Sequence, residues 1–270
     1  MRIHDGAYGT LLHDYLRGDE TVDDLCIRAP ALVVDAHRAY LDSGAQVIQT
    51  NAFLSHVRGS SRRRMQLRAA AHECVLEAIA AVATGESDDD QPAAAWTIGP
   101  AGDEPRAFWE TIEQALEREA GIVLCETVTS RGIADALIAA WADVARGIRD
   151  VELLLGCSTD PTDRARSGWI VELASEAPQD VLLGLNCCEG PLGMRGLLEE
   201  LAQVRGRTWA MPSAGLPTGD PPRWPLADPD AWAEATLAAI DELPVVGVGG
   251  CCGTGPDAVA ALAASVRTTR

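Results

Sequence analysis

Lysine is absent from this 270-residue sequence, so all 22 of its formally cationic side chains are arginines. Chemistry that depends on a lysine amine, such as Schiff-base formation or a P-loop, is therefore excluded. Acidic residues number 40, which gives a formal charge of −18 at pH 7. Because contacts to phosphate need clustered cations, this charge balance argues against a nucleic-acid partner.

Long apolar runs are also missing. No stretch reaches the roughly 18 to 20 apolar residues that span a bilayer, so we expect no membrane partner. The first residues lack the apolar segment of a signal peptide, and we therefore expect a cytoplasmic location. Aromatic residues make up only 4% of the chain, so leucine, valine, isoleucine and alanine must fill most of the core.

Short apolar, β-branched runs recur along the chain and alternate with amphipathic segments. This alternation is typical of parallel strands that are covered on both faces by helices. The predicted strands are Arg2–His4, Gln46–Thr50, Ala95–Ile98, Ile122–Cys125, Glu152–Gly156, Val181–Leu185, Thr208–Met211 and Val245–Val248. The predicted helices include Ala31–Ser43, Arg62–Ala83, Arg106–Ala120, Ile133–Arg146, Leu192–Val204 and Asp257–Val266.

Eight strand–helix units in about 250 residues match a TIM (β/α)8 barrel of the α/β class. No stretch is left over for a second domain, so residues 1–270 are predicted to form one barrel domain, with the acidic segment Thr84–Ala94 as a surface loop. An open, doubly wound sheet is the main alternative. Such a sheet is expected to have a G-x-G-x-x-G fingerprint after its first strand, and Asp5–Thr10 does not have this spacing.

Residues capable of chemistry collect just past the carboxyl ends of the predicted strands. In a barrel those ends meet at one rim, where the active sites of this fold lie. Asp5 or Glu126 alone could merely cap a helix, but their shared place on the rim favours a functional role. The rim segments are Asp5-Gly6, Thr50-Asn51, Gly99-Pro100, Glu126-Thr127, Asn186-Cys187-Cys188, Ser213-Ala214-Gly215 and Gly249–Thr254.

Cysteine is plentiful, with eight residues, and without an export signal such thiols indicate metal or redox chemistry rather than disulfides. Two adjacent pairs, Cys187-Cys188 and Cys251-Cys252, can together supply three thiolates to a tetrahedral zinc and leave a fourth position open. Packing thiols or a redox couple are the alternatives, because the spacing is not the C-x-x-C of a zinc ribbon. Most of the isolated cysteines are expected to be inert buried thiols: Cys26, Cys74, Cys125 and Cys157.

A zinc in such a site would give a particular kind of chemistry. It would let a substrate thiol bind as a thiolate at neutral pH, where a free thiol with a pKa of about 8.5 is mostly protonated. An anionic sulfur is suited to attack on an electrophilic carbon.

Ordered motifs along essentially the whole chain carry a family resemblance. They are Asp5-Gly-Ala-Tyr-Gly-Thr10, His37-Arg-Ala-Tyr-Leu-Asp-Ser-Gly-Ala-Gln-Val-Ile-Gln-Thr-Asn-Ala-Phe53, Ile98-Gly-Pro100, Glu126-Thr127, Gly184-Leu-Asn-Cys187, Ser213-Ala-Gly-Leu-Pro217 and Gly249-Gly-Cys-Cys-Gly-Thr-Gly-Pro256. In this order they resemble the homocysteine S-methyltransferase family, which includes betaine–homocysteine methyltransferase and the homocysteine domain of cobalamin-dependent methionine synthase.

The resemblance implies a TIM barrel and a set of site residues. The zinc ligands would be Cys187, Cys251 and Cys252, which would also be the catalytic centre, whereas Cys188 would be a spare thiol. The remaining roles concern homocysteine: Asp5 and Glu126 would bind its amino group, the Gly6 amide and the Thr50-Asn51 turn would lie near its carboxylate, and Asn186 would shape the loop or hydrogen-bond the substrate.

The reaction that the resemblance implies is methyl transfer to zinc-bound homocysteine, giving methionine, by in-line displacement at the donor methyl carbon. The donor would be S-adenosylmethionine, S-methylmethionine, a betaine-like compound, or a methylated corrinoid or folate delivered by a separate protein. Ser213 and Ala52 stand where the family usually has asparagine and threonine, which leaves the donor open. A different thiol or selenol acceptor, or a non-catalytic zinc or thiol redox protein, are the alternative functions.

Overall fold

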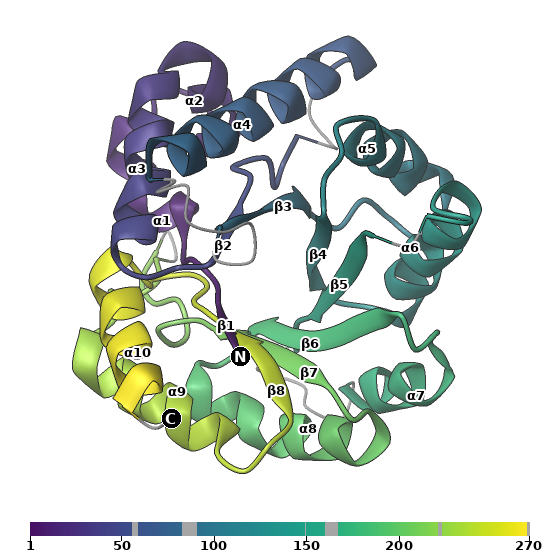
Figure 1. Ribbon diagram of the computed structural model, residues 1–270, viewed down its shortest axis with the longest axis vertical. Coiled ribbons are helices and arrows are strands. Elements are labelled where there is room, and N and C mark those ends of the chain that lie inside the picture. The colour runs from purple at the N-terminus through teal and green to yellow at the C-terminus, as the bar shows by residue number, and fades with distance from the viewer. Residues whose placement is uncertain (56–58, 83–90, 149, 160–166, 221–222, 269–270) are drawn as a thin grey trace.

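One parallel sheet organises the molecule in the computed structural model, which describes residues 1–55, 59–82, 91–148, 150–159, 167–220 and 223–268. The eight strands of this sheet follow the order β1-β8-β7-β6-β5-β4-β3-β2. Figure 1 shows them as a ring of arrows with the helices outside it. The strands are β1 (Arg2–Ile3), β2 (Val47–Gln49), β3 (Ala93–Ile98), β4 (Ile122–Val128), β5 (Glu152–Cys157), β6 (Val181–Cys187), β7 (Thr208–Pro212) and β8 (Val245–Val248).

The ring closes between the two strands that end the sheet order, β1 and β2. His4 forms a parallel bridge with Val47 just beyond β1. Two backbone hydrogen bonds flank this bridge, from the amide of Asp5 to the carbonyl of Val47 at 3.1 Å and from the amide of Gln46 to the carbonyl of Ile3 at 2.7 Å. The predicted (β/α)8 barrel is therefore confirmed, and the open doubly wound sheet is excluded.

Helices cover the outside of the barrel and return the chain from each strand to the next. None of the helices in the described ranges is both long enough and apolar enough to cross a membrane. Four of the helices were not named in the prediction: α1, α2, α7 and α9. The helical elements are α1 (Tyr8–Leu11), η1 (His13–Tyr15), α2 (Val22–Arg28), α3 (Pro30–Asp42), α4 (Ser61–Val82), α5 (Arg106–Glu117), α6 (Arg131–Val144), α7 (Gly168–Glu176), α8 (Pro191–Val204), α9 (Pro229–Ile240) and α10 (Pro256–Thr268).

Local sequence sets several of the helix starts. Pro30, Pro191 and Pro229 occupy the first turn of α3, α8 and α9, where a missing amide hydrogen costs nothing. The side chain of Ser130 accepts a hydrogen bond from an amide in the first turn of α6. Asp228 does the same for α9, so these starts follow from capping chemistry.

Five strands are longer than their apolar runs suggested, and three of them by two residues or more. β4 continues to Val128, which pairs with Cys157 after a register shift, and β6 continues to Cys187, which pairs with Pro212. β3 begins at Ala93, so the last two residues of the predicted loop Thr84–Ala94 are strand, whereas residues 83–90 lie outside the described residues. Glu126, Thr127, Asn186 and Cys187 thus sit in the last residues of strands rather than in loops.

The core has two layers. A small inner cluster fills the barrel, and a large outer cluster lies between the sheet and the helices. Trp209 is the largest member of the inner cluster and is fully buried. A Cβ at Gly184 would lie 2.5 Å from the Cγ of Trp209, and one at Gly156 would lie 2.8 Å from its Cη2. Glycines on β5 and β6 therefore make room for this indole ring. The inner cluster consists of Val47, Ala95, Ile122, Leu124, Leu154, Trp209 and Met211.

Candidate metal centre and substrate site

Three cysteines from two distant parts of the chain meet at the carboxyl end of the barrel. Cys187 is the last residue of β6, and Cys251 and Cys252 follow β8. Their sulfur atoms all lie within 4.8 Å of one another, and the sulfurs of Cys251 and Cys252 are 4.0 Å apart. In the part of the chain that the structure describes, no other group of His, Cys, Asp or Glu meets this criterion.

Backbone contacts hold these cysteines in place. The carbonyl of Cys187 accepts a hydrogen bond from the amide of Ser213 at 2.9 Å, and the amide of Cys251 donates to the carbonyl of Pro212 at 3.0 Å. Cys187 and Cys188 both have positive φ angles, of 64° and 53°, a region that non-glycine residues rarely adopt. Such strain costs roughly 1–3 kcal/mol per residue and is concentrated at functional sites.

The three thiols fit a metal ion of the zinc type. With Zn–S bonds of about 2.3 Å, tetrahedral ligand sulfurs lie roughly 3.8 Å apart, close to the separations found here. All three side chains are only partly buried, so a further ligand can approach. The hydrogen bond with Cys187, together with burial, holds the pKa of the Cys251 thiol well above its usual value. A bound cation would act in the opposite direction, because a thiol that coordinates a metal loses its proton.

Asp5 lies at the carboxyl end of β1 with no exposed surface, yet its carboxylate is well supplied with donors. The Tyr8 hydroxyl donates to Oδ2 at 2.6 Å, the Gln49 amide donates to Oδ2 at 2.7 Å, and the Gln49 side chain donates to Oδ1 at 2.9 Å. Burial raises the pKa of Asp5 to about 7, although these hydrogen bonds oppose the rise.

Glu126 is the second carboxylate of the site and is partly exposed. Burial and the nearby negative charge of Asp5 raise the pKa of Glu126 to about 8. Asn186, which is fully buried, approaches Glu126 Oε2 at 3.4 Å and Cys251 Sγ at 3.9 Å through its Nδ2 atom. Its Oδ1 accepts the Thr127 amide at 2.8 Å, so this side chain joins Glu126 and the end of β4 to Cys251.

The remaining predicted residues lie at the same rim, but their side chains are committed elsewhere. Thr50 Oγ1 accepts the Thr97 amide at 2.9 Å, and Asn51 Nδ2 donates to the Val22 carbonyl at 2.7 Å. A Cβ at Gly6 would lie 2.6 Å from the Thr254 carbonyl oxygen, so only glycine fits there. Contacts of this turn or of the Gly6 amide with a substrate carboxylate stay predictions.

Two residues of the carboxylate network were not predicted, namely Tyr8 and Gln49. Both stand in the motifs that carry the resemblance. Gln49 had a usable signal, because a buried strand rarely contains an amide side chain without a partner. Cys188 is buried and points its thiol at the Asn186 carbonyl at 3.4 Å, outside the group of three.

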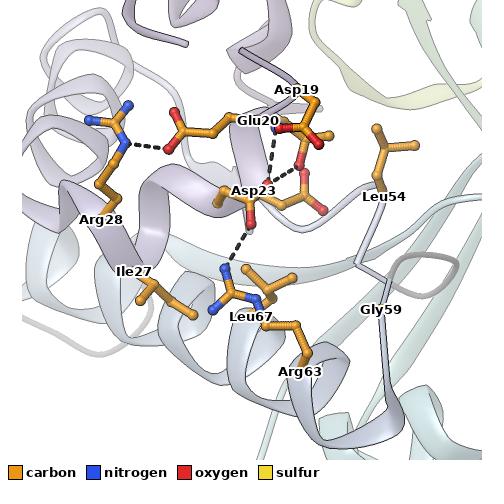
Figure 2. Close-up of a pocket in the computed structure, with 11 residues that line it drawn as sticks. Asp19, Glu20, Asp23, Ile27, Arg28, Leu54, Gly59, Arg63 and Leu67 are labelled. Atoms are coloured by element: carbon orange, nitrogen blue, oxygen red, sulfur yellow. Dashed lines mark hydrogen bonds and ion pairs between the residues drawn. The ribbon is translucent and has the colours of Figure 1, made fainter. Parts of the chain in front are cut away.

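A separate acidic cavity of about 460 Å³ is lined by α2, α4 and the loop after β2, and by none of the predicted site residues. Figure 2 shows Arg28 paired with Glu20 and Arg63 reaching up from α4. These are ion pairs of 2.8 Å between Arg28 and Glu20 and of 2.7 Å between Arg63 and Asp24. The Arg63–Asp24 pair therefore ties α4 to α2, and the Arg28–Glu20 pair ties α2 to the segment before it.

The fold and the site together define a (β/α)8-barrel protein with a three-thiol group that could hold a metal beside two carboxylates. The family model described as homocysteine S-methyltransferase matches residues 2–266. The chain belongs to this family, which confirms the resemblance drawn from the motifs.

Relatives and solved structures agree with this membership. The chain is 28% identical over 294 residues to methionine synthase of Mycobacterium leprae and 27% identical over 293 residues to that of Mycobacterium tuberculosis. Each match covers 98% of this chain but only 24% of the relative, so the chain spans about a quarter of these proteins.

Among solved structures, the metallated form of the homocysteine methyltransferase MmuM from Escherichia coli has the same fold, with a TM-score of 0.75 at 20% identity, and the match covers 98% of this chain and 96% of that one. A monomeric dihydrodipicolinate synthase variant reaches a TM-score of 0.55 at 14% identity over 99% of this chain and 75% of that one. The second likeness shows that the barrel is shared well beyond this family.

Proposed function

We propose that residues 1–270 form one homocysteine-binding barrel domain that transfers a methyl group to the sulfur of homocysteine, giving methionine, and that this activity depends on zinc. The observation that carries the proposal is the convergence of Cys187, Cys251 and Cys252, whose sulfurs lie within 4.8 Å of one another at the rim. Three protein ligands with room for a fourth are typical of catalytic rather than structural zinc sites.

The three cysteines would hold the metal. When bound there, zinc lowers the pKa of a substrate thiol that joins it, so that the sulfur is nucleophilic at neutral pH without a side-chain base. Asn186 supports this arrangement because it contacts both Cys251 and Glu126. Its amide keeps the acidic part of the site in a fixed relation to the thiols.

Asp5 and Glu126 would bind the amino group of homocysteine. Both carboxylates are held in low-dielectric surroundings, and Asp5 raises the pKa of Glu126 by repulsion. A substrate ammonium placed between them would relieve this repulsion. The Gly6 amide and the Thr50-Asn51 turn would then lie near the substrate carboxylate.

The methyl donor is proposed to be either a small molecule or a methylated cofactor on a separate protein. Small candidates are S-adenosylmethionine, S-methylmethionine and betaine-like compounds, and the carrier candidates are corrinoid or folate.

A metal assay combined with a donor screen tests the proposal. We expect about one zinc per chain, and methionine when homocysteine is supplied with the right donor. Cys251→Ala should lose both zinc and activity. Cys188→Ala is the matched control, because its thiol lies outside the group of three and should leave zinc bound. Zinc-free protein with titratable disulfides would favour a redox protein, and transfer to another thiol or selenol but not to homocysteine would correct the acceptor.

A further inference from the structure

The carboxylate of Asp5 has almost no freedom left, because the protein itself satisfies most of its acceptor positions. Each carboxylate oxygen can accept about two hydrogen bonds. Oδ2 already accepts two, from Tyr8 and from the Gln49 amide, and Oδ1 accepts one from the Gln49 side chain. By this count Oδ1 can accept one further hydrogen bond.

Tyr8 is itself held by aromatic packing. Its ring makes edge contacts with His37, at 4.7 Å between centroids, and with Tyr40, at 5.2 Å. Tyr40 in turn donates to the Thr254 carbonyl at 3.1 Å, and Thr254 Oγ1 donates to the carbonyl of Cys251 at 2.5 Å. A continuous set of contacts thus links the Asp5 carboxylate to the loop that carries two of the cysteines.

We propose that Tyr8 and Gln49 are positioning residues that hold the Asp5 carboxylate for the amino group of the thiol substrate, and so make the site select an amino-acid thiol over the same thiol without its amino group. This inference rests on the proposed function, in which Asp5 binds the amino group of homocysteine. Without the Tyr8 hydroxyl, the buried carboxylate loses a charge-assisted hydrogen bond. It can then rotate or take up a proton, and either change weakens its binding of an ammonium group.

Equilibrium binding to the zinc-loaded protein tests the inference without any methyl donor. Titration calorimetry would compare homocysteine with 4-mercaptobutanoate, which has the same chain, thiol and carboxylate but no amino group. Wild-type protein should bind homocysteine at least about tenfold more tightly. Tyr8→Phe keeps the ring and removes only the hydroxyl, and it should weaken homocysteine binding about tenfold while 4-mercaptobutanoate binding changes by less than about twofold.

Gln49→Met and Tyr40→Phe complete the set. Gln49→Met removes the side-chain donor, keeps the backbone donor, and should lower the preference in the same way, so it carries the test if Tyr8→Phe does not fold. Tyr40→Phe is the matched control, since it removes a buried hydroxyl of the same aromatic cluster that bonds a backbone carbonyl instead of Asp5. It should leave the ratio of the two affinities unchanged.

The outcomes distinguish a failure of this inference from a failure of the proposed function on which it rests. A wild-type ratio in both Tyr8→Phe and Gln49→Met, or an equal loss for both thiols, would overturn the inference while homocysteine binding still stands. Wild-type zinc protein that binds neither thiol would overturn the inference together with the proposed function.

Discussion

At the residue scale, two adjacent aspartates in α2 have opposite electrostatic fates. Asp23 is buried, and burial raises its pKa to about 7; the amides of Leu54 and Ser55 oppose this rise, but neither makes a well-formed hydrogen bond to the carboxylate. Burial also acts on Asp24, but the Thr21 amide and Arg63 outweigh it and hold the pKa of Asp24 below its usual value. The same residue type therefore weakens the fold at one position and supports it at the next.

We predict that Asp23→Asn is more stable than wild type, and that its advantage grows as pH rises. Because the folded-state pKa of Asp23 is above the unfolded value, its contribution is present at low pH and is lost as pH rises to about 7. The difference in unfolding free energy between Asp23→Asn and wild type should therefore increase by about 2 kcal/mol from pH 5 to pH 8. Urea denaturation at the two pH values measures it.

Asp24→Asn is the matched control with the opposite sign. It removes the partner of Arg63 and the carboxylate of the capping box with Thr21, so it should destabilise the protein at pH 8, by about 1 kcal/mol. If both variants changed stability in the same direction at pH 8, burial would not be the cause of the raised pKa of Asp23.

At the element scale, the sequence predicted where strands begin more reliably than where they end. The apolar runs located all eight strands. β4 and β6 nevertheless run on through polar residues such as Glu126 and Asn186, because neighbouring strands offer backbone partners at Cys157 and Pro212. Pairing of this kind depends on the register between strands, which a single sequence does not contain.

The sequence likewise predicted some parts of the candidate site and not others. The residues that would hold metal and substrate stand in local motifs, and the convergence of Cys187 with Cys251 and Cys252 follows from the barrel topology. The donors to Asp5 could not be derived, because whether Gln49 faces the carboxylate depends on the closure between β1 and β2. Periodicity locates a strand but does not fix which side chains meet across the closing seam.

Replacement of two glycines by alanine should change stability in opposite directions. At Gly184 in β6, a Cβ would lie 2.4 Å from the Trp209 carbonyl oxygen and 2.5 Å from its ring, so Gly184→Ala should destabilise the barrel by at least about 3 kcal/mol. At Gly196 in α8 no atom beyond the neighbouring residues and the backbone of the helix itself lies within 4 Å of the new Cβ, so Gly196→Ala should stabilise the helix by about 0.5–1 kcal/mol. Equilibrium denaturation of both variants checks this, and equal effects would contradict the close packing of Trp209.

At the scale of the whole molecule, buried titratable groups set how stability varies with pH. His4 and His37 are buried, and desolvation lowers their pKa values to about 4 and about 3. Folded-state pKa values below the unfolded value of 6.5 give stability that is present above pH 6.5 and is lost as pH falls. Asp5 and Asp23, with pKa values raised to about 7, and Glu126, with a pKa raised to about 8, act in the opposite sense.

These opposing contributions predict a particular pH profile for the metal-free protein. Between about pH 5 and pH 6.5 the gain from the two histidines offsets the loss from the two aspartates, but Glu126 adds a further loss, so the unfolding free energy should fall by about 2 kcal/mol. From pH 6.5 to pH 8 the gain from the histidines is small while the three carboxyl groups still ionise, and the unfolding free energy should fall by about another 2 kcal/mol. Buried Cys125 and Cys157, whose pKa values burial raises, steepen the fall toward pH 9, because only the unfolded thiols ionise there. Urea denaturation of chelator-treated protein across this range measures the profile, and stability that rises from pH 6.5 to pH 8 would show that the aspartates are ionised in the folded state at much lower pH.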